Sequence, residues 1–100
     1  DLFPDDPVYL ATLGVALYRT GQHDQALDIL LHAENLAERR KSRRAPNWAF
    51  IAMCRWKLGQ ADQARIALAK FRDLAKQARW KSDPEVVTWL VEAEALIAPP

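Results

Sequence analysis

The stretch Gly59-Gln60-Ala61-Asp62-Gln63-Ala64 is a second copy of Gly21-Gln22-His23-Asp24-Gln25-Ala26, which lies thirty-eight residues earlier in the chain. In each copy a glycine follows a run of apolar residues at helical spacing, and an aspartate stands three positions after that glycine. A glycine just past the end of a helix adopts the left-handed conformation that other residues resist, and an acid suits the first turn of the next helix. Each copy therefore predicts a turn that ends one helix and begins another.

The repetition extends beyond these two turns. When the chain is shifted by thirty-eight residues, further pairs are identical: Ala11 with Ala49, Leu30 with Leu68, Leu36 with Leu74, and Ala37 with Ala75. Other pairs are similar: Leu10 with Trp48, Leu13 with Ile51, Gly14 with Ala52, and Tyr18 with Trp56. These matches fall at expected core and turn positions, and a fixed period in this range is typical of a helical repeat array.

The spacing of apolar residues predicts five helices and an all-α fold. Two of them begin at the pairs Asp6-Pro7 and Asp83-Pro84, in which the aspartate caps the helix and the proline takes the first helical position. We expect helices over about 7–19, 24–38, 47–58, 62–78 and 84–97. The chain then divides into a lead-in (1–6), a first repeat (7–40), a basic connection (41–46), a second repeat (47–80) and a closing helix (83–98).

Composition excludes several classes of protein. Half of the 100 residues are apolar and 27% are charged, as in a soluble, helix-rich globular chain too short for a catalytic domain with a deep pocket. No apolar run approaches the roughly 20 residues of a membrane span. The single cysteine, Cys54, cannot form an internal disulfide, and no signal peptide is apparent, so the cytoplasm is the expected compartment. Without an initiator methionine, the chain is expected to be a segment of a longer protein.

The residue types that act in catalysis or bind metals do not stand at the spacings that these functions require. His23 and His32 lack cysteines or carboxylates at metal-ligand spacing, and we expect His23 to pack at its turn. Cys54 lacks the neighbouring histidine or helix N-terminus that activates a thiol, so we expect it to be a small buried residue. The chain has neither a glycine-rich phosphate loop nor a nucleophile–base pair. We therefore expect no enzymatic activity and no cofactor.

The repeated positions resemble the tetratricopeptide repeat (TPR) family over roughly residues 7–78. The first copy carries the motif at Leu10, Leu13, Gly14, Leu17, Gly21, Ala26, Leu30 and Ala33, and the second at Trp48, Ile51, Ala52, Gly59, Ala64, Leu68 and Phe71. The period exceeds the family's 34 residues, and we place the extra residues in the basic connection. The resemblance implies a right-handed α-solenoid of two helical hairpins followed by a closing helix.

In the TPR family the first helix of each hairpin lines a concave groove that binds peptides. Carried over by position, the groove would comprise Val15, Tyr18, Arg19, Met53, Trp56 and Lys57, with Ala11 and Ala49. Tyr18 over Trp56, beside Arg19 and Lys57, would form an aromatic and basic strip, and aromatic and arginine side chains are frequent at binding hot spots. The resemblance thus implies a non-catalytic protein-interaction module, whose partner is a peptide or a neighbouring domain. The alternative is that Tyr18 and Trp56 pack on each other or against the closing helix.

A second hypothesis rests on the basic residues Arg39, Arg40, Lys41, Arg43 and Arg44. They could form a patch for an anionic partner such as nucleic acid, or simply a solvated helix end and loop. Aromatic residues that would stack on bases do not occur among them, so nucleic acid is not the expected partner. A third hypothesis is a purely structural or dimerising segment, because an array usually needs about three repeats for stability. The arrangement also resembles the TPR tails of large bacterial signalling proteins, including serine/threonine kinases.

The nucleic-acid hypothesis predicts binding that weakens steeply with added salt, because contacts to phosphates release counterions. Replacing the five basic residues by glutamine should then abolish binding. Fluorescence anisotropy with labelled duplex and single-stranded DNA between 50 and 200 mM salt measures both effects. Binding that is insensitive to salt would exclude this hypothesis.

Overall fold

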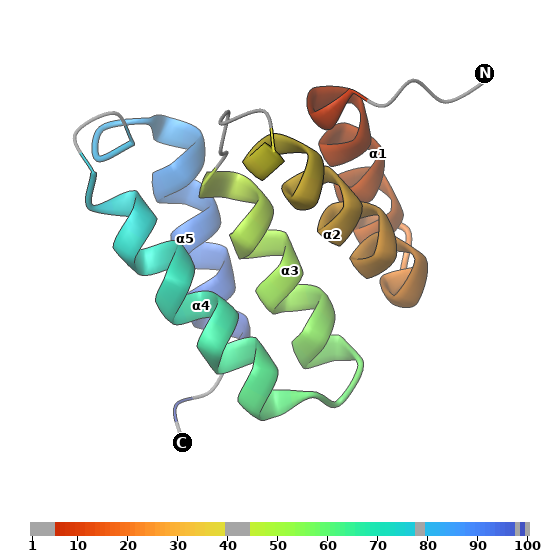
Figure 1. Cartoon of the computed structure of the whole chain (residues 1–100). Coiled ribbons are helices and arrows are strands. Elements are labelled where there is room, and N and C mark those ends of the chain that lie inside the picture. The colour runs from red at the N-terminus through yellow and green to blue at the C-terminus, as the bar shows by residue number, and fades with distance from the viewer. Residues whose placement is uncertain (1–5, 40–44, 78–79, 98, 100) are drawn as a thin grey trace.

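A computed structural model describes residues 6–39, 45–77, 80–97 and 99 of the chain. The described residues form five helices and no strand, which confirms the all-α prediction (Figure 1). The helices are α1 (Pro7–Arg19), α2 (His23–Arg39), α3 (Ala45–Lys57), α4 (Ala61–Ala75) and α5 (Pro84–Leu96). Two bounds differ from those predicted by more than one residue. α4 ends at Ala75, and α3 begins within the predicted basic connection. Pro46 falls in the first turn of α3, where a backbone N–H would have no acceptor within the helix, so the proline costs no helical hydrogen bond.

The two repeated turns have the same backbone structure. Gly21 and Gly59 adopt the left-handed conformation, with φ of 85° and 80°. In each turn the glycine N–H donates to the carbonyl three residues earlier at 3.1 Å, and the next N–H donates to the carbonyl five residues earlier at 2.8–2.9 Å. This pair of bonds satisfies carbonyl groups at the helix end that would otherwise lack partners. The predicted turns are therefore confirmed in position and in mechanism.

The two Asp-Pro pairs also act as predicted. Asp6 accepts a hydrogen bond from the N–H of Val8 at 2.9 Å, and Asp83 accepts from the N–H groups of Glu85 and Val86 at 2.9 and 3.3 Å. By contrast, Asp24 and Asp62 lie inside the first turns of α2 and α4, where their charge complements the helix dipole. These local signals explain why the starts of α1 and α5 were readable from the sequence.

The core is built around α3, which contacts all four other helices. The first hairpin packs α1 against α2 and the second packs α3 against α4, as Figure 1 shows. Gly14 permits close packing in the first hairpin, since a Cβ there would lie 2.6 Å from the Leu30 side chain. The side chains from Ala49 to Cys54 are all fully buried. A helix that is apolar on every side must be covered on every side.

The junctions between successive hairpins are not equivalent. Of the two helices of the first hairpin, α3 packs mainly on the second, α2, and only lightly on the first, α1. In contrast, α5 packs mainly on α3, the first helix of the preceding hairpin, and less on α4. The closing helix thus lies deeper over α3 than a strict copy of the first junction would place it.

We predict that Gly59→Ala lowers the free energy of unfolding by about 1–2 kcal/mol, because a Cβ in the left-handed region clashes with the backbone. Gly59→Asn should cost less, since asparagine tolerates this conformation better. Apart from the glycine itself and its two chain neighbours, no heavy atom lies within 4 Å of the added Cβ, so crowding by the rest of the fold does not contribute. Urea unfolding measures the difference, with exposed Gln63→Ala in α4 as the control. Equal stability of Gly59→Ala and the wild-type chain would contradict this account of the turn.

Candidate functional site

The structure buries part of the predicted groove. Met53 is fully buried, and Tyr18 is only 8% exposed. The neighbouring positions Ala11 and Ala49 are also buried. Because a fully buried side chain offers no surface to a partner, the prediction that Met53 lines an open groove is wrong for this structure.

Three aromatic rings link α1, α3 and α5. Tyr18 of α1 contacts Phe50 of α3 with ring centroids 5.6 Å apart, and Phe50 contacts Trp89 of α5 at 5.2 Å. Both pairs are edge-to-face, an arrangement that aromatic quadrupoles favour. His23 packs 5.4 Å from the Tyr18 ring, which confirms the packing interpretation of this histidine. Burial, followed by the nearby Glu92 carboxylate, raises the pKa of the Tyr18 hydroxyl, so Tyr18 remains neutral at physiological pH.

Tyr18 and Trp56 do not form the predicted strip. The Trp56 ring is half-buried and faces Arg65 of α4, whose guanidinium carbon lies 5.8 Å from the ring centroid. Lys57 is exposed at the end of α3. Tyr18 instead reaches the closing helix through Phe50, so the alternative of packing toward that helix describes its position better.

Arg19 connects α1 to α5 across this aromatic cluster. Its two terminal nitrogens donate to the two carboxylate oxygens of Glu92, with the Nη2–Oε1 distance 2.9 Å. The guanidinium carbon lies 5.3 Å from the Phe50 centroid and 5.8 Å from that of Tyr18. The Arg19 and Glu92 side chains nevertheless remain 47% and 32% exposed. The pair thus presents an ordered charged surface above a buried aromatic floor.

We refer to Val15, Arg19, Thr88 and Glu92 as the α1–α5 seam. Val15 lies one turn before Arg19 and is half-buried, and Thr88 lies one turn before Glu92 and is exposed. Of the six predicted groove residues, this surface retains Val15 and Arg19. Thr88 and Glu92 were missed because the predicted groove included no residue of the closing helix.

A buried carboxylate was also missed. Glu34 of α2 is 5% exposed and accepts hydrogen bonds from the Asn47 amide at 3.2 Å and the Trp48 indole N–H at 3.0 Å. These bonds join α2 to the first turns of α3. A signal was present in the sequence, because Glu34 lies on the apolar face of its helix, one turn after Leu30 and one turn before Ala37.

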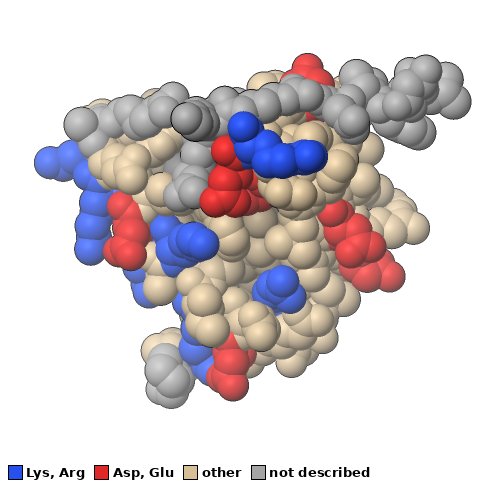
Figure 2. Space-filling model, viewed as in Figure 1, with Lys and Arg blue, Asp and Glu red and all other residues tan. Residues whose placement is uncertain are grey.

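The basic patch is described only at its first residue. Arg39 is exposed at the end of α2, whereas Arg40, Lys41, Arg43 and Arg44 lie outside the described residues. Figure 2 shows lysine and arginine side chains over the α4 side of the molecule, with acidic side chains among them. The described surface in this view therefore contains no uninterrupted basic area.

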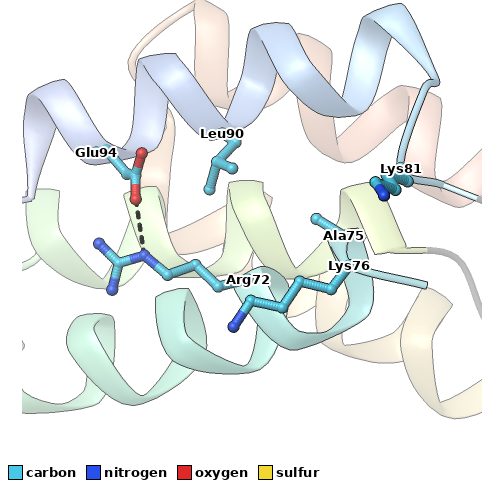
Figure 3. Close-up of a pocket in the computed structure, with 6 residues that line it drawn as sticks. All are labelled: Arg72, Ala75, Lys76, Lys81, Leu90 and Glu94. Carbon is cyan, nitrogen blue, oxygen red and sulfur yellow. Dashed lines mark hydrogen bonds and ion pairs between the residues drawn. The ribbon is translucent and has the colours of Figure 1, made fainter. Parts of the chain in front are cut away.

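A pocket of about 450 Å³ lies between α4 and α5. Its apolar part is formed by Ala75 of α4 and Leu90 of α5, which points toward α4 in Figure 3. The other lining residues are charged: Arg72, Lys76, Lys81 and Glu94. The Arg72 Nε donates to a Glu94 carboxylate oxygen at 2.7 Å across one end of the pocket.

The described residues contain no group of three or more His, Cys, Asp or Glu side chains that could hold a metal ion. Burial raises the pKa of the Cys54 thiol to about 12, so this cysteine is a protonated core residue and a poor nucleophile. Within the described part of the chain, no helix has both the length and the apolar character needed to cross a bilayer.

Comparisons of the chain with protein-family models, with curated proteins and with solved structures found no match. The geometry and chemistry of the chain itself therefore carry the functional argument.

We predict that Glu34→Ala lowers the free energy of unfolding by about 1–3 kcal/mol, because the buried Asn47 amide and the partly buried Trp48 indole N–H lose their acceptor. Glu34→Gln should cost less, since its amide oxygen still accepts one hydrogen bond. Urea unfolding followed by tryptophan fluorescence provides the comparison. Asp28→Ala removes an exposed acid from the same helix and should change stability by less than about 0.5 kcal/mol. If Glu34→Ala is no more destabilising than Asp28→Ala, the buried network does not stabilise the α2–α3 junction.

Proposed function

We propose that this chain is a non-catalytic protein-interaction module with a TPR-like architecture, in which two helical hairpins and a closing helix form a right-handed array. Support comes from the two glycine turns, which share one backbone conformation and one hydrogen-bonding pattern at a spacing of thirty-eight residues. The close packing of Gly14 against Leu30 is the kind of contact that the small residue of the motif permits. The unequal placement of α3 and α5 means that the array is not strictly regular.

The binding surface in this proposal is the α1–α5 seam. The observation that carries it is the half-exposed Arg19 guanidinium, held over Phe50 and Tyr18 by Glu92. An arginine ordered in this way has lost side-chain freedom before a partner arrives, so binding costs less entropy. Arg19 has five N–H donors, and its bonds to Glu92 leave others for a second acceptor.

The matching partner is a peptide segment with an acidic side chain next to an apolar one. Its carboxylate would accept hydrogen bonds from Arg19, and its apolar side chain would cover the exposed part of Val15. In this arrangement Tyr18, Phe50 and Trp89 support the site from below and do not touch the partner. Glu92 competes with the partner for Arg19, because both groups are carboxylates.

This competition predicts opposite effects for two substitutions that break the same ion pair. Arg19→Gln should weaken binding of an acidic peptide at least tenfold, because the cation is removed. Glu92→Gln should leave the affinity unchanged or increase it severalfold, because Arg19 is freed. Peptides would first be selected on the wild-type protein from a displayed library of random linear sequences. Their dissociation constants would then be measured for each variant by isothermal titration calorimetry.

Lys76→Glu provides a charge-changing control at the α4–α5 pocket, outside the seam. Urea unfolding checks that both seam variants fold, and a half-exposed ion pair should contribute about 0–1 kcal/mol to stability. Equal weakening by Arg19→Gln and Glu92→Gln would mean that the pair serves only as a structural link between α1 and α5. Selected peptides that lack acidic residues would also refute the proposed recognition.

A further inference from the structure

The α4–α5 pocket lies outside the seam and has a different character. Within the described residues, neither Lys76 nor Lys81 takes part in an ion pair, whereas the charge of Arg72 is met by Glu94. Ala75 and Leu90 are each only partly buried at its floor. The pocket thus combines an exposed apolar floor with two cationic side chains that are available to an anionic partner (Figure 3).

The internal repeat allows the burial of Ala75 and Leu90 to be compared with that of the aligned residues earlier in the chain. The positions thirty-eight residues before Ala75 and Leu90 are Ala37 and Ala52, and both are fully buried. The position thirty-eight residues before Arg72 is Glu34, which is also buried. The aligned residues of α2 and α3 are therefore buried, whereas Ala75 and Leu90 are only partly buried.

At the first position of this series the neighbouring element is a helix. Gly14, Ala52 and Leu90 occupy the same place in three successive first helices. Gly14 faces Leu30 of α2, the second helix of its own hairpin. Ala52 belongs to α3, which pairs with α4 in the same way. Among the described residues no helix follows α5, and Leu90 stays partly buried beside Ala75 of α4.

We propose that the α4–α5 pocket is a second binding surface, which receives one face of an acidic amphipathic helix from a partner protein. Apolar side chains of that helix would rest on Ala75 and Leu90, and its carboxylates would accept hydrogen bonds from Lys76 and Lys81. Helix binding in a groove uses apolar anchors spaced three and four residues apart. An added β-strand would find no partner, because the backbone N–H and C=O groups of α4 and α5 are bonded within their helices.

The proposal can be tested with a displayed library of alanine-based helices that are randomised at six positions on one face. Selection on the wild-type protein should enrich helices with Leu, Ile, Met or Phe at spacings of three or four, flanked by Asp or Glu. Isotope-labelled protein would then be titrated with the selected helix, and the residues whose NMR chemical shifts change should lie in α4 and α5.

The decisive variant is Lys76→Glu/Lys81→Glu, in which both altered side chains are exposed, so folding should be retained. It should weaken binding of the selected helix at least tenfold, because two attractive charges become repulsive. Arg19→Gln changes the seam alone and should leave this affinity within twofold. Conversely, the double lysine variant should still bind the linear peptides selected for the seam, so failure at either surface is distinguishable from failure at the other.

Three results would overturn the proposal. The library could yield no enriched helix, or the enriched helices could bind the double lysine variant as well as the wild-type protein. The wild-type chain could also self-associate in sedimentation experiments through this pocket, with dimers that disappear in Lys76→Glu/Lys81→Glu. That result would assign the surface to a second copy of the chain, whose α5 is itself acidic and carries exposed Val87 and Val91.

Discussion

The rest of the structure depends on the complete burial of the middle of α3. Every side chain from Ala49 to Cys54 is enclosed, so this part of the helix has no free face. If one side of this helix were left uncovered, its apolar surface would stay in water, at a cost of about 25 cal/mol of folding free energy for each Å². The other helices must therefore surround it, and α5 completes the enclosure on the side where Phe50 meets Trp89. The position of the closing helix follows from the need to cover α3.

Polar side chains then specify how the helices are placed on this apolar core. Glu34 joins α2 to α3, while the Arg19–Glu92 and Arg72–Glu94 pairs join α5 to α1 and α4. The buried Glu34 network should matter most for stability, since losing a buried acceptor costs more than losing an exposed ion pair. The two exposed pairs add little stability but hold arginines in defined positions. In the proposed function, the partial exposure of Arg19 would allow it to exchange the Glu92 carboxylate for that of a partner.

The segregation of charge along the chain acquires a structural explanation in this arrangement. The last nineteen residues carry four acids and no base, and the preceding region is strongly basic. In the folded chain Asp83 caps α5, while Glu92 and Glu94 meet arginines on two different helices. Much of the acidic tail is thus used within the molecule. Lys76 and Lys81 remain as basic groups beside a partly exposed apolar surface, and this is the basis of the preference for acidic partners that we propose for the α4–α5 pocket.

The features that were predictable from the sequence are those governed by a few neighbouring residues. The left-handed turns at Gly21 and Gly59 and the capped helix starts at Asp6 and Asp83 depend on the backbone preferences of those residues, so the number and approximate bounds of the helices followed. The candidate site was predictable only in part. Val15 and Arg19 lie on an accessible surface, whereas Met53 is enclosed by helices that pack on α3 from distant parts of the chain. Only the tertiary structure decided where α5 lies and which carboxylate meets Arg19. The physical reason is that the meeting of the Arg19 and Glu92 side chains depends on how Tyr18, Phe50 and Trp89 pack between α1, α3 and α5, and no local preference of those three residues encodes this packing.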